Sequence, residues 1–447
     1  MPSCYTPLPS QAKPDAMTEP AFKSDFLRTL QARGYIHQIT HPAELDAAAV
    51  AWIVTGYIGF DATAPSLHVG SLIQIMMLRR LQQAGGKPIV LMGGGTTKVG
   101  DPTGKDASRP QLTEETSQSN IASIKTVFEK FLTFGDGPTD AVMVDNDAWL
   151  STYGYVEFLR DYGTHFTINR MLAFDSVKLR LEREQPMTFL EFNYMLMQSV
   201  DFLELNRARN CTLQMGGSDQ WGNIVSGVDL VRRVDQKAAF GLTTPLLTSS
   251  SGGKMGKTAQ GAVWLNAEQL SPYDYWQFWR NVDDADVGKF LRLFTDLPLD
   301  QIARLEAQEG AGINDAKKTL ADAATTMLHG AYAAGRARET AESAFEKGVA
   351  TDGLHTEDMP WAGTLDEQER NDGPFTDRRA EALLKWSGLS PSIGQARKKI
   401  ENEGVWINDQ LVRDPAQLFA LDQVDPELKA FKVRLGKRGQ IVLVRPH

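Results

Sequence analysis

The feature that most constrains the fold is a strand, helix, strand pattern between residues 50 and 92. The segment from Val50 to Phe60 is rich in Val, Ile, Trp and Tyr, which is typical of a buried strand. Apolar residues then recur at helical spacing from about Gly70 to Gly85, and Pro88 to Met92 predicts a second strand. Two strands joined in this way form a parallel, right-handed crossover. We therefore expect an α/β fold with a Rossmann-like, doubly wound parallel sheet.

The rest of the chain predicts further units, because 447 residues exceed what one hydrophobic core usually serves. We expect a long apolar helix over residues 189–206, a strand over 211–215 and a helix from about 219 to 234. Residues 271–347 are helical in pattern, and their aromatic cluster at 273–279 is interpreted as helix core. The predicted domains are a disordered extension (1–20), a Rossmann-like domain (21–250) with an insertion (about 108–210), a loop and α-helical domain (251–348), an acidic linker (349–377) and a small α+β domain (378–447).

Composition excludes several classes of protein. The two cysteines, Cys4 and Cys211, can build neither a disulfide framework nor a metal cluster, which fits a reducing cytoplasm. The longest nearly apolar stretch, residues 47–60, is too short to span a bilayer, and we interpret it as a buried strand. The first twenty residues have five prolines and no apolar h-region, so we expect neither a targeting signal nor a membrane association.

The charge is distributed unevenly along the chain. The net charge is -9, which argues against nonspecific binding of polyanions by the whole surface. Residues 376–447 nevertheless have thirteen Lys and Arg against nine Asp and Glu, a net +4 that leaves -13 for the preceding residues. A contact with nucleic acid is therefore expected at the C-terminal end.

Two stretches resemble a P-loop but fail its structural requirements. S-G-G-K-M-G-K-T (251–258) has Ser in place of the first Gly, and a strand-like segment follows it directly, so no helix opens to collect phosphate. G-D-P-T-G-K (100–105) lacks both the first Gly and the Ser or Thr after the Lys. We reject both as P-loops.

Two other segments have the residues needed to hold phosphate. His68-Val69-Gly70-Ser71 lies where the first strand passes into its helix, and a helix N-terminus attracts anions. Lys254, Lys257 and Thr258 lie on a Gly- and Ser-rich loop, where the lysines would neutralise a departing pyrophosphate. Each segment alone has an ordinary structural explanation. Together they predict attack on the α-phosphate of a nucleotide.

Polar residues on two further segments indicate a ligand pocket. Tyr194, Gln198 and Asp201 are spaced i, i+4 and i+7, which places them on one face of an apolar helix. A buried carboxylate needs hydrogen-bond donors, and either an internal network or a small polar ligand would supply them. In Gly216 to Gln220, after a strand, Ser218 is the predicted helix cap and Asp219 is placed to accept a ribose hydroxyl, although capping alone also explains both.

The chain resembles bacterial-type tyrosyl-tRNA synthetases from about residue 25 to its end. The resemblance rests on Y-I-G-F-D-A-T-A-P-S-L-H-V-G-S (57–71), G-D-P-T-G-K (100–105), F-L-E-F-N-Y-M-L-M-Q-S-V-D (189–201), Q-M-G-G-S-D-Q-W-G-N (214–223) and K-M-G-K-T (254–258), in this order. P-S-I-G-Q-A-R-K-K-I-E-N-E-G-V-W-I-N-D (391–409) resembles the S4-type RNA-binding domain of that family. This implies a class I enzyme that activates L-tyrosine with ATP and passes the tyrosyl group to tRNA(Tyr), with residues 251–348 on the anticodon side.

The resemblance also implies roles for individual residues. The catalytic signatures H-I-G-H and K-M-S-K-S correspond to His68, Gly70, Ser71, Lys254, Lys257 and Thr258. The residues implied for tyrosine are Tyr57 and Asp201 at the phenol, Asp101, Tyr194 and Gln198 at the ammonium, and Gln220 near the carboxylate. Those implied for ATP are Gly59, Asp61, Gly217, Asp219 and Lys257, with Lys105 and Arg109 in a mobile segment near the phosphates. Those implied for RNA are Arg397, Lys398 and Lys399.

The remaining implications concern cofactors and partners. Mg²⁺ is expected on the ATP phosphates, without a tightly bound metal ligated by the protein. A homodimer is implied, formed through the insertion that includes Phe189. Ser71 stands in place of the second His of its signature, Ile58 in place of a frequent Cys, and Gly256 in place of Ser. These differences change individual ATP contacts and leave the reaction unchanged.

Two alternatives remain at this point. A tryptophanyl-tRNA synthetase shares the fold, and Asp201 opposite Tyr57 argues for a phenol over an indole. A catalytically silent RNA-binding protein would keep the C-terminal domain, but it would need neither Lys254 and Lys257 nor Asp101.

Overall fold

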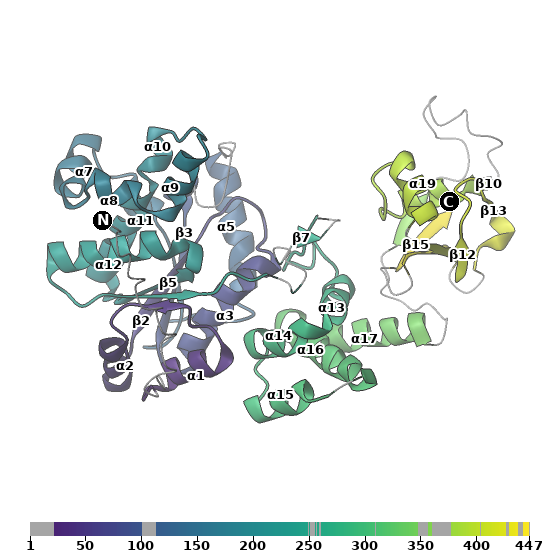
Figure 1. Ribbon diagram of the computed structural model, residues 1–447, viewed down its shortest axis with the longest axis horizontal. Coiled ribbons are helices and arrows are strands. Elements are labelled where there is room, and N and C mark those ends of the chain that lie inside the picture. Colours follow the sequence, from purple (N-terminus) through teal and green to yellow (C-terminus); the bar gives the residue numbers. More distant parts are fainter. Residues whose placement is uncertain are drawn as a thin grey trace, which may run out of the picture.

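A parallel sheet forms the centre of the N-terminal part of the chain (Figure 1). The computed structural model describes residues 22–100, 113–248, 250, 255, 257–258, 261–308, 310–346, 356–359, 377–402, 404–425, 429–436 and 441–446. The sheet has the order β1-β6-β5-β2-β3-β4, and only β1 is antiparallel to its neighbour. Its strands are β1 (Gln38–Ile39), β2 (Thr55–Phe60), β3 (Lys87–Met92), β4 (Val142–Asp145), β5 (Leu213–Gly217) and β6 (Phe240–Thr244). The predicted α/β class and parallel sheet are confirmed.

The first strand is shorter than the sequence predicts. Helix α1 (Asp25–Arg33) is followed by α2 (Pro42–Ala51), which has proline in its first turn and covers the start of the predicted strand. The strand prediction for residues 47–60 is therefore wrong up to Ala51, because the alanines there favour a helix and β2 begins only at Thr55.

Helix α3 (Val69–Gln83) connects β2 to β3, as the pattern predicts. His68 is its N-cap, and the ring Nδ1 accepts a hydrogen bond of 3.0 Å from the amide of Gly70. The helix ends before Gly85, whose φ of 84° is in the left-handed region that favours glycine. The end of β2 and the start of α3 thus lie at the carboxyl edge of the sheet.

The segment predicted as an insertion contributes to the sheet itself. Helix α4 (Gly94–Thr97) precedes this segment. The segment itself contains α5 (Glu114–Phe128), β4, α6 (Asp147–Leu150), α7 (Tyr155–Asp161), α8 (Ile168–Leu172) and α9 (Asp175–Glu182). Because β4 pairs with β3 and α5 gives Phe128 to the main core, the insertion is shorter than residues 108–210. The predicted helix over 189–206 is divided into α10 (Phe189–Phe192), which begins with a capping box at Thr188, and α11 (Tyr194–Arg209).

After β5, the chain turns through residues 218–220 into α12 (Trp221–Asp235). The prediction that Ser218 caps this helix is wrong, because Gln220 occupies the N-cap position and makes no capping hydrogen bond through its side chain. A short 3-10 turn at 218–220 separates Ser218 from the first turn of α12.

Five helices form a unit beside the sheet (Figure 1). They are α13 (Pro272–Arg280), α14 (Val287–Phe294), α15 (Leu299–Glu306), α16 (Ile313–His329) and α17 (Ala331–Glu346). The aromatic residues of α13 are buried, including Trp276 and Trp279, which confirms the interpretation of this cluster as helix core. No helix of the described residues is long and apolar enough to cross a membrane.

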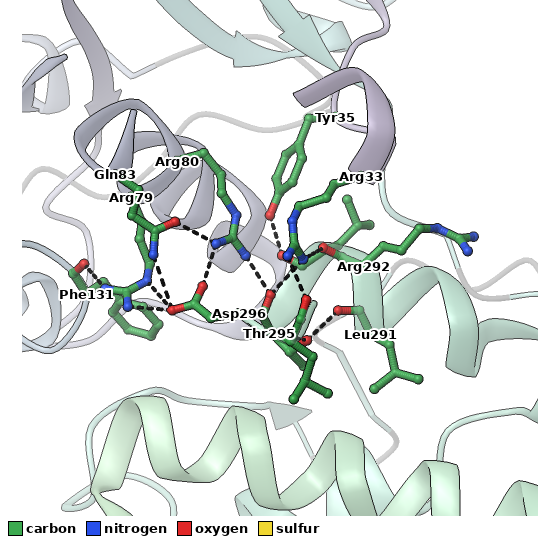
Figure 2. A network of polar contacts seen from close by, with 12 residues as sticks. Arg33, Tyr35, Arg79, Arg80, Gln83, Phe131, Leu291, Arg292, Thr295 and Asp296 are labelled. Atoms are coloured by element: carbon green, nitrogen blue, oxygen red, sulfur yellow. Dashed lines mark hydrogen bonds and ion pairs between the residues drawn. The ribbon is translucent and has the colours of Figure 1, made fainter. Parts of the chain in front are cut away.

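A polar network joins this helical unit to the sheet domain (Figure 2). Arg33 of α1 donates to the backbone carbonyls of Thr295 and Leu297, and the Arg80 guanidinium of α3 donates to the Thr295 carbonyl at 2.6 Å. The Asp296 carboxylate accepts from both Arg79 and Arg80. Burial works to raise the pKa of Asp296, but the two arginines outweigh it and lower that pKa to about 2.

The C-terminal residues form an α+β unit with a hydrophobic cluster of its own, and Ala430, Ile441 and Leu443 of this unit belong to the main core cluster. A five-stranded sheet has the order β12-β11-β14-β15-β9, and β10 pairs with β13 in a second, two-stranded sheet. The described elements of this unit are β9 (Thr356–Met359), β10 (Asp377–Arg379), α18 (Ala380–Trp386), α19 (Ile393–Asn402), β11 (Val405–Ile407), β12 (Gln410–Val412), β13 (Leu418–Ala420), β14 (Phe431–Leu435) and β15 (Ile441–Pro446). Strand β9 lies inside the predicted acidic linker and pairs in parallel with β15. The linker over 349–377 is therefore interrupted by a strand of the C-terminal sheet.

Candidate functional site

A cavity of about 400 Å³ opens at the carboxyl edge of the parallel strands. This is the place where ligands of doubly wound folds bind, and the volume suits a small molecule. Many of the predicted site residues line it: Tyr57, Gly59, Asp61, His68, Gly70, Ser71, Tyr194, Gln198, Asp201, Gly217, Asp219 and Gln220. Residues from β2, α3, α11 and the turn after β5 are thus brought together as the sequence predicts.

One end of the cavity, the buried end, is formed by Tyr57, Asp201 and Asn146, and Trp149 supports Asp201 from outside the lining. The Asp201 carboxylate is 2% exposed and accepts hydrogen bonds from Asn146 Nδ2 at 2.9 Å and from Trp149 Nε1 at 2.8 Å. The hydroxyl of Tyr57, which is also buried, has no hydrogen-bond partner among the residues that the structure describes. A buried polar atom without a partner is costly unless a ligand supplies one. This end is therefore shaped to receive a polar group.

Burial changes the protonation of both groups at the buried end. Burial raises the pKa of Asp201 to about 7, and the nearby carboxylates of Asp145 and Glu204 add to the shift, while the hydrogen bonds from Asn146 and Trp149 oppose it. Burial and the charge of Asp201 also raise the pKa of the Tyr57 hydroxyl well above its ordinary value. Tyr57 is thus a neutral hydroxyl, and Asp201 is ionised above about pH 7.

Amide side chains lie along the wall between the two ends. Asn223 Nδ2 donates to Gln198 Oε1 at 3.0 Å and to Gln220 Oε1 at 3.1 Å, which links α11 to the turn that precedes α12. Tyr194, also on α11, is 7% exposed. The predicted face of Tyr194, Gln198 and Asp201 on α11 therefore forms one side of the cavity.

The other end, the nucleotide end, is formed by His68, Gly70, Gly217 and Asp219. A Cβ on Gly70 would lie 2.6 Å from His68 Cε1 and 3.1 Å from the carbonyl oxygen of Met255. A Cβ on Gly217 would lie 2.5 Å from Asp219 Oδ1. These two positions therefore need glycine, and the backbone is left accessible at the N-terminus of α3.

The lysine-bearing loop is described only in part. Residues 257–258 form β7 (Lys257–Thr258), which pairs with β8 (Gly261–Ala262), so no helix opens after this segment and the rejection of a P-loop there is confirmed. Asp101, Lys105, Arg109 and Lys254 lie outside the described residues. Their predicted roles stay predictions.

The basic residues of α19 are engaged to different degrees. Arg397 pairs with the buried carboxylate of Glu381, and Lys399 Nζ donates to the Leu389 carbonyl at 2.8 Å. Lys398 is exposed. Of the three residues predicted to contact RNA, Arg397 and Lys399 thus also stabilise the fold of the C-terminal domain.

Sequence reasoning missed Asn146, Trp149 and Gln74. Asn146 and Trp149 follow β4, and the Gln74 Oε1 atom is buried without a partner at the cavity wall. The pattern V-M-V-D-N (142–146), a short apolar strand followed by polar residues, was a usable signal, because carboxyl ends of parallel strands meet at one edge.

Comparison with known proteins gives consistent matches. Residues 53–346 match the family model described as tRNA synthetases class I (W and Y). A tyrosine–tRNA ligase of Caulobacter sp. (strain K31) is 68% identical over 426 residues, which cover 95% of this chain and 99% of the relative. One of Rhodospirillum rubrum is 55% identical over 96% of this chain and 99% of the relative. The crystal structure of a C-terminally truncated mitochondrial tyrosyl-tRNA synthetase of Aspergillus nidulans matches with a TM-score of 0.65 and 30% identity, over 72% of this chain and 94% of that one.

Proposed function

The chain belongs to the class I tRNA synthetases of the tryptophan and tyrosine type, and we propose that it forms tyrosyl-adenylate from L-tyrosine and ATP and then charges tRNA(Tyr). The observation that carries the choice of substrate is the unpartnered Tyr57 hydroxyl beside the ionisable Asp201 at the buried end. A phenol hydroxyl would donate to Asp201 and accept from Tyr57. A phenyl ring would make no hydrogen bond to either group, and an indole has no acceptor for the Tyr57 hydroxyl, so both would leave that buried hydroxyl without a partner.

The proposed first step needs no nucleophile from the protein. The tyrosine carboxylate attacks the α-phosphorus, a new O–P bond forms, and the bond to pyrophosphate breaks. Tyr194 and Gln198, with Asp101, would bind the substrate ammonium, and Gln220 would lie near the carboxylate. In the second step a ribose hydroxyl at the 3' end of the tRNA attacks the tyrosyl carbonyl, and AMP leaves.

The nucleotide end would hold ATP chiefly by backbone and charge. Gly59, Asp61, Gly217 and Asp219 would surround the adenosine, while His68, Gly70 and Ser71 at the N-terminus of α3 would lie near the phosphates. Lys254, Lys257 and Thr258 would neutralise the departing pyrophosphate, with Lys105 and Arg109 near the phosphates.

Mg²⁺ is proposed to enter with the nucleotide. Among the described residues no group of three or more His, Cys, Asp or Glu side chains is arranged to hold a metal ion, so the phosphates themselves would supply most of its ligands. When bound, Mg²⁺ would neutralise charge on the phosphates.

The test of this function is tyrosine-dependent exchange of pyrophosphate into ATP. We expect exchange with tyrosine and none with tryptophan or phenylalanine. Exchange with tryptophan alone would refute the substrate, and exchange with no amino acid would favour the catalytically silent RNA-binding protein.

The C-terminal domain is proposed to bind tRNA in the manner of an S4 domain. Its net positive charge and the exposed Lys398 on α19 support this. Because β9 pairs with β15, a clean truncation must end before β9, at about residue 350. That truncation should preserve pyrophosphate exchange and lower tRNA charging at least about tenfold. Loss of both steps would contradict a separate RNA-binding role.

A homodimer is proposed through the surface formed by α7 to α10, which lie together at one end of the sheet domain (Figure 1). Large apolar side chains are exposed there, namely Tyr155, Val156, Ile168, Leu172, Leu181, Phe189 and Leu190. A concentration of this kind indicates a protein interface. Phe189→Glu with Leu190→Glu should give a monomer in sedimentation. Val50→Glu with Trp52→Glu, at exposed apolar residues at the end of α2, is the control and should leave the dimer intact.

A further inference from the structure

The residues that precede the proposed lysine loop are held by one short stretch of the helical unit. The amide of Ser250 donates to Asp286 Oδ2 at 2.8 Å, and its hydroxyl donates to Asp283 Oδ2 at 2.9 Å. Lys289 Nζ donates to the carbonyl of Thr248 at 2.8 Å. Residue 251, where the lysine-bearing loop begins, therefore follows a segment that α14 and its preceding turn hold in place.

Asp286 is the central residue of this group. It is the N-cap of α14 and is 5% exposed, yet its side chain makes no capping hydrogen bond to its own helix. An aspartate at this position ordinarily accepts from an amide in the first turn. Instead one carboxylate oxygen accepts from Ser250, and the other lies 3.7 Å from Lys289 Nζ. The Asp286 carboxylate therefore binds the segment that precedes the loop and does not cap its own helix.

The opposite end of α14 is anchored to α3 and to the C-terminal end of α1. Tyr35 donates to the Leu293 carbonyl, Arg33 donates to the Arg292 carbonyl at 3.0 Å, and Arg80 donates to the Thr295 carbonyl just beyond the helix (Figure 2). α14 also packs directly on α3. It is therefore a rigid support, tied to the same helix whose N-terminus contains His68 and Gly70.

The far side of the loop returns to that N-terminus. The amide of Val69 donates to the Val263 carbonyl at 2.9 Å, and the amide of Leu265 donates to the Leu67 carbonyl at 2.9 Å. The start and the end of the loop are thus fixed to α14 and to the start of α3 respectively. Lys254 and Lys257 lie between these two anchors in the sequence.

We propose that Asp286 is a positioning residue for adenylate formation, which acts through Ser250 to set where the segment bearing Lys254 and Lys257 begins. The inference rests on the proposed role of these lysines at the pyrophosphate. A charge acting on a transition state must be placed accurately, because a small displacement removes much of its effect on the rate. Asp286 is not among the residues that line the cavity, so its removal should lower the rate and leave tyrosine binding unchanged.

The experiment measures pyrophosphate exchange, tyrosine binding and the melting temperature of full-length variants. Asp286→Ala should lower kcat for exchange about tenfold, with the Kd for tyrosine unchanged. Asp286→Asn keeps an oxygen that accepts from Ser250, so it should retain most of the rate. If the melting temperature shows that the alanine variant folds poorly, a loss of rate in the well-folded asparagine variant would still contradict the inference. Asp284→Ala is the matched control, because this carboxylate is two residues away, 69% exposed and paired with Lys317, and it should behave as the wild type.

Lys257→Ala distinguishes failure of the inference from failure of the function. If Lys257→Ala retains the full exchange rate, the lysine role is wrong and the inference falls with it. If Lys257→Ala is inactive but Asp286→Ala matches the wild type, only the inference is overturned. It is also overturned if Asp286→Ala weakens tyrosine binding in proportion to its loss of rate, since a general loss of structure would do this.

Discussion

The buried end and the nucleotide end of the cavity achieve recognition by opposite means. At the buried end, side chains from separate elements are placed in advance: Asn146 and Trp149 hold Asp201, and Tyr57 has an unpaired hydroxyl. At the nucleotide end, Gly70 and Gly217 have no side chain, so the backbone there is accessible. A Cβ at either position would also meet a neighbouring side chain. Under the proposed function, selection of the amino acid would depend on side chains that are present, whereas access of the phosphates would depend on the absence of side chains at the two glycines.

The largest effect should come from Asp201→Ala at the buried end. The substrate hydroxyl would lose a charged acceptor, and the donors of Asn146 and Trp149 would be left without a partner. Loss of such a hydrogen bond corresponds to about 100-fold in kcat/KM for tyrosine. The loss of stability should be smaller than the loss of activity, because removing a buried carboxylate with a raised pKa offsets part of the cost of the two unpaired donors at neutral pH.

Asp235→Ala is the control for this variant. Asp235 is at the end of α12 and pairs with Arg207 outside the cavity, so its loss should leave kcat/KM unchanged. If the activity that Asp201→Ala loses is fully accounted for by the fraction of the variant that is unfolded, the carboxylate serves an internal network alone.

A smaller effect is expected from Gly70→Ala at the nucleotide end. The added Cβ would lie 2.6 Å from the His68 ring, so either the ring or the start of α3 must move. We expect kcat/KM for ATP to fall about 30-fold while the Kd for tyrosine stays the same. Gly335→Ala, at a helical glycine with open space around its Cβ, is the matched control. Equal loss of ATP use and tyrosine binding would show that the two ends do not act separately.

These two ends were not equally predictable from the sequence. Most of the nucleotide end follows from local pattern, because His68, Gly70, Gly217 and Asp219 lie at strand-to-helix turns that periodicity and glycine reveal. At the buried end, helical spacing indicated Asp201 but left an internal network as an equal explanation, and Tyr57 required the family resemblance, since a tyrosine in a strand has an ordinary structural explanation.

Other features could not be predicted because tertiary pairing decides them. Asn146 and Trp149 follow β4, a strand of four residues inside what was taken as an insertion, and only its pairing with β3 brings them to the cavity. β9 has an acidic composition typical of a linker, and it becomes a strand by pairing with β15. The start of β2 was misplaced because apolar residues before Thr55 fit a helix as well as a strand.

Trp149→Phe is a finer test of the buried end. It removes one hydrogen bond of 2.8 Å to Asp201 and keeps an aromatic ring of similar position. With Asn146 still donating, the carboxylate keeps one partner, so we expect about a fivefold rise in KM for tyrosine with kcat nearly constant. Steady-state exchange at varied tyrosine measures this. An unchanged KM would mean that Asn146 alone orients Asp201.

The smallest effect should be a pH dependence that is confined to the buried end. The phenol donates to ionised Asp201, whose pKa is raised to about 7 by burial, so tyrosine affinity should fall about fourfold from about pH 8 to about pH 6.5. Stability of the free protein should move the other way: the folded state holds this proton more tightly than the unfolded state, so the contribution of Asp201 to stability is present below about pH 4 and is lost as the pH rises to about 7. Tyrosine titrations and thermal melts across this range measure both trends, and Asp201→Asn should abolish both. The affinity for ATP should not change over this pH range through Asp201. A tyrosine affinity independent of pH would mean that Asp201 is already ionised in the free enzyme throughout the range.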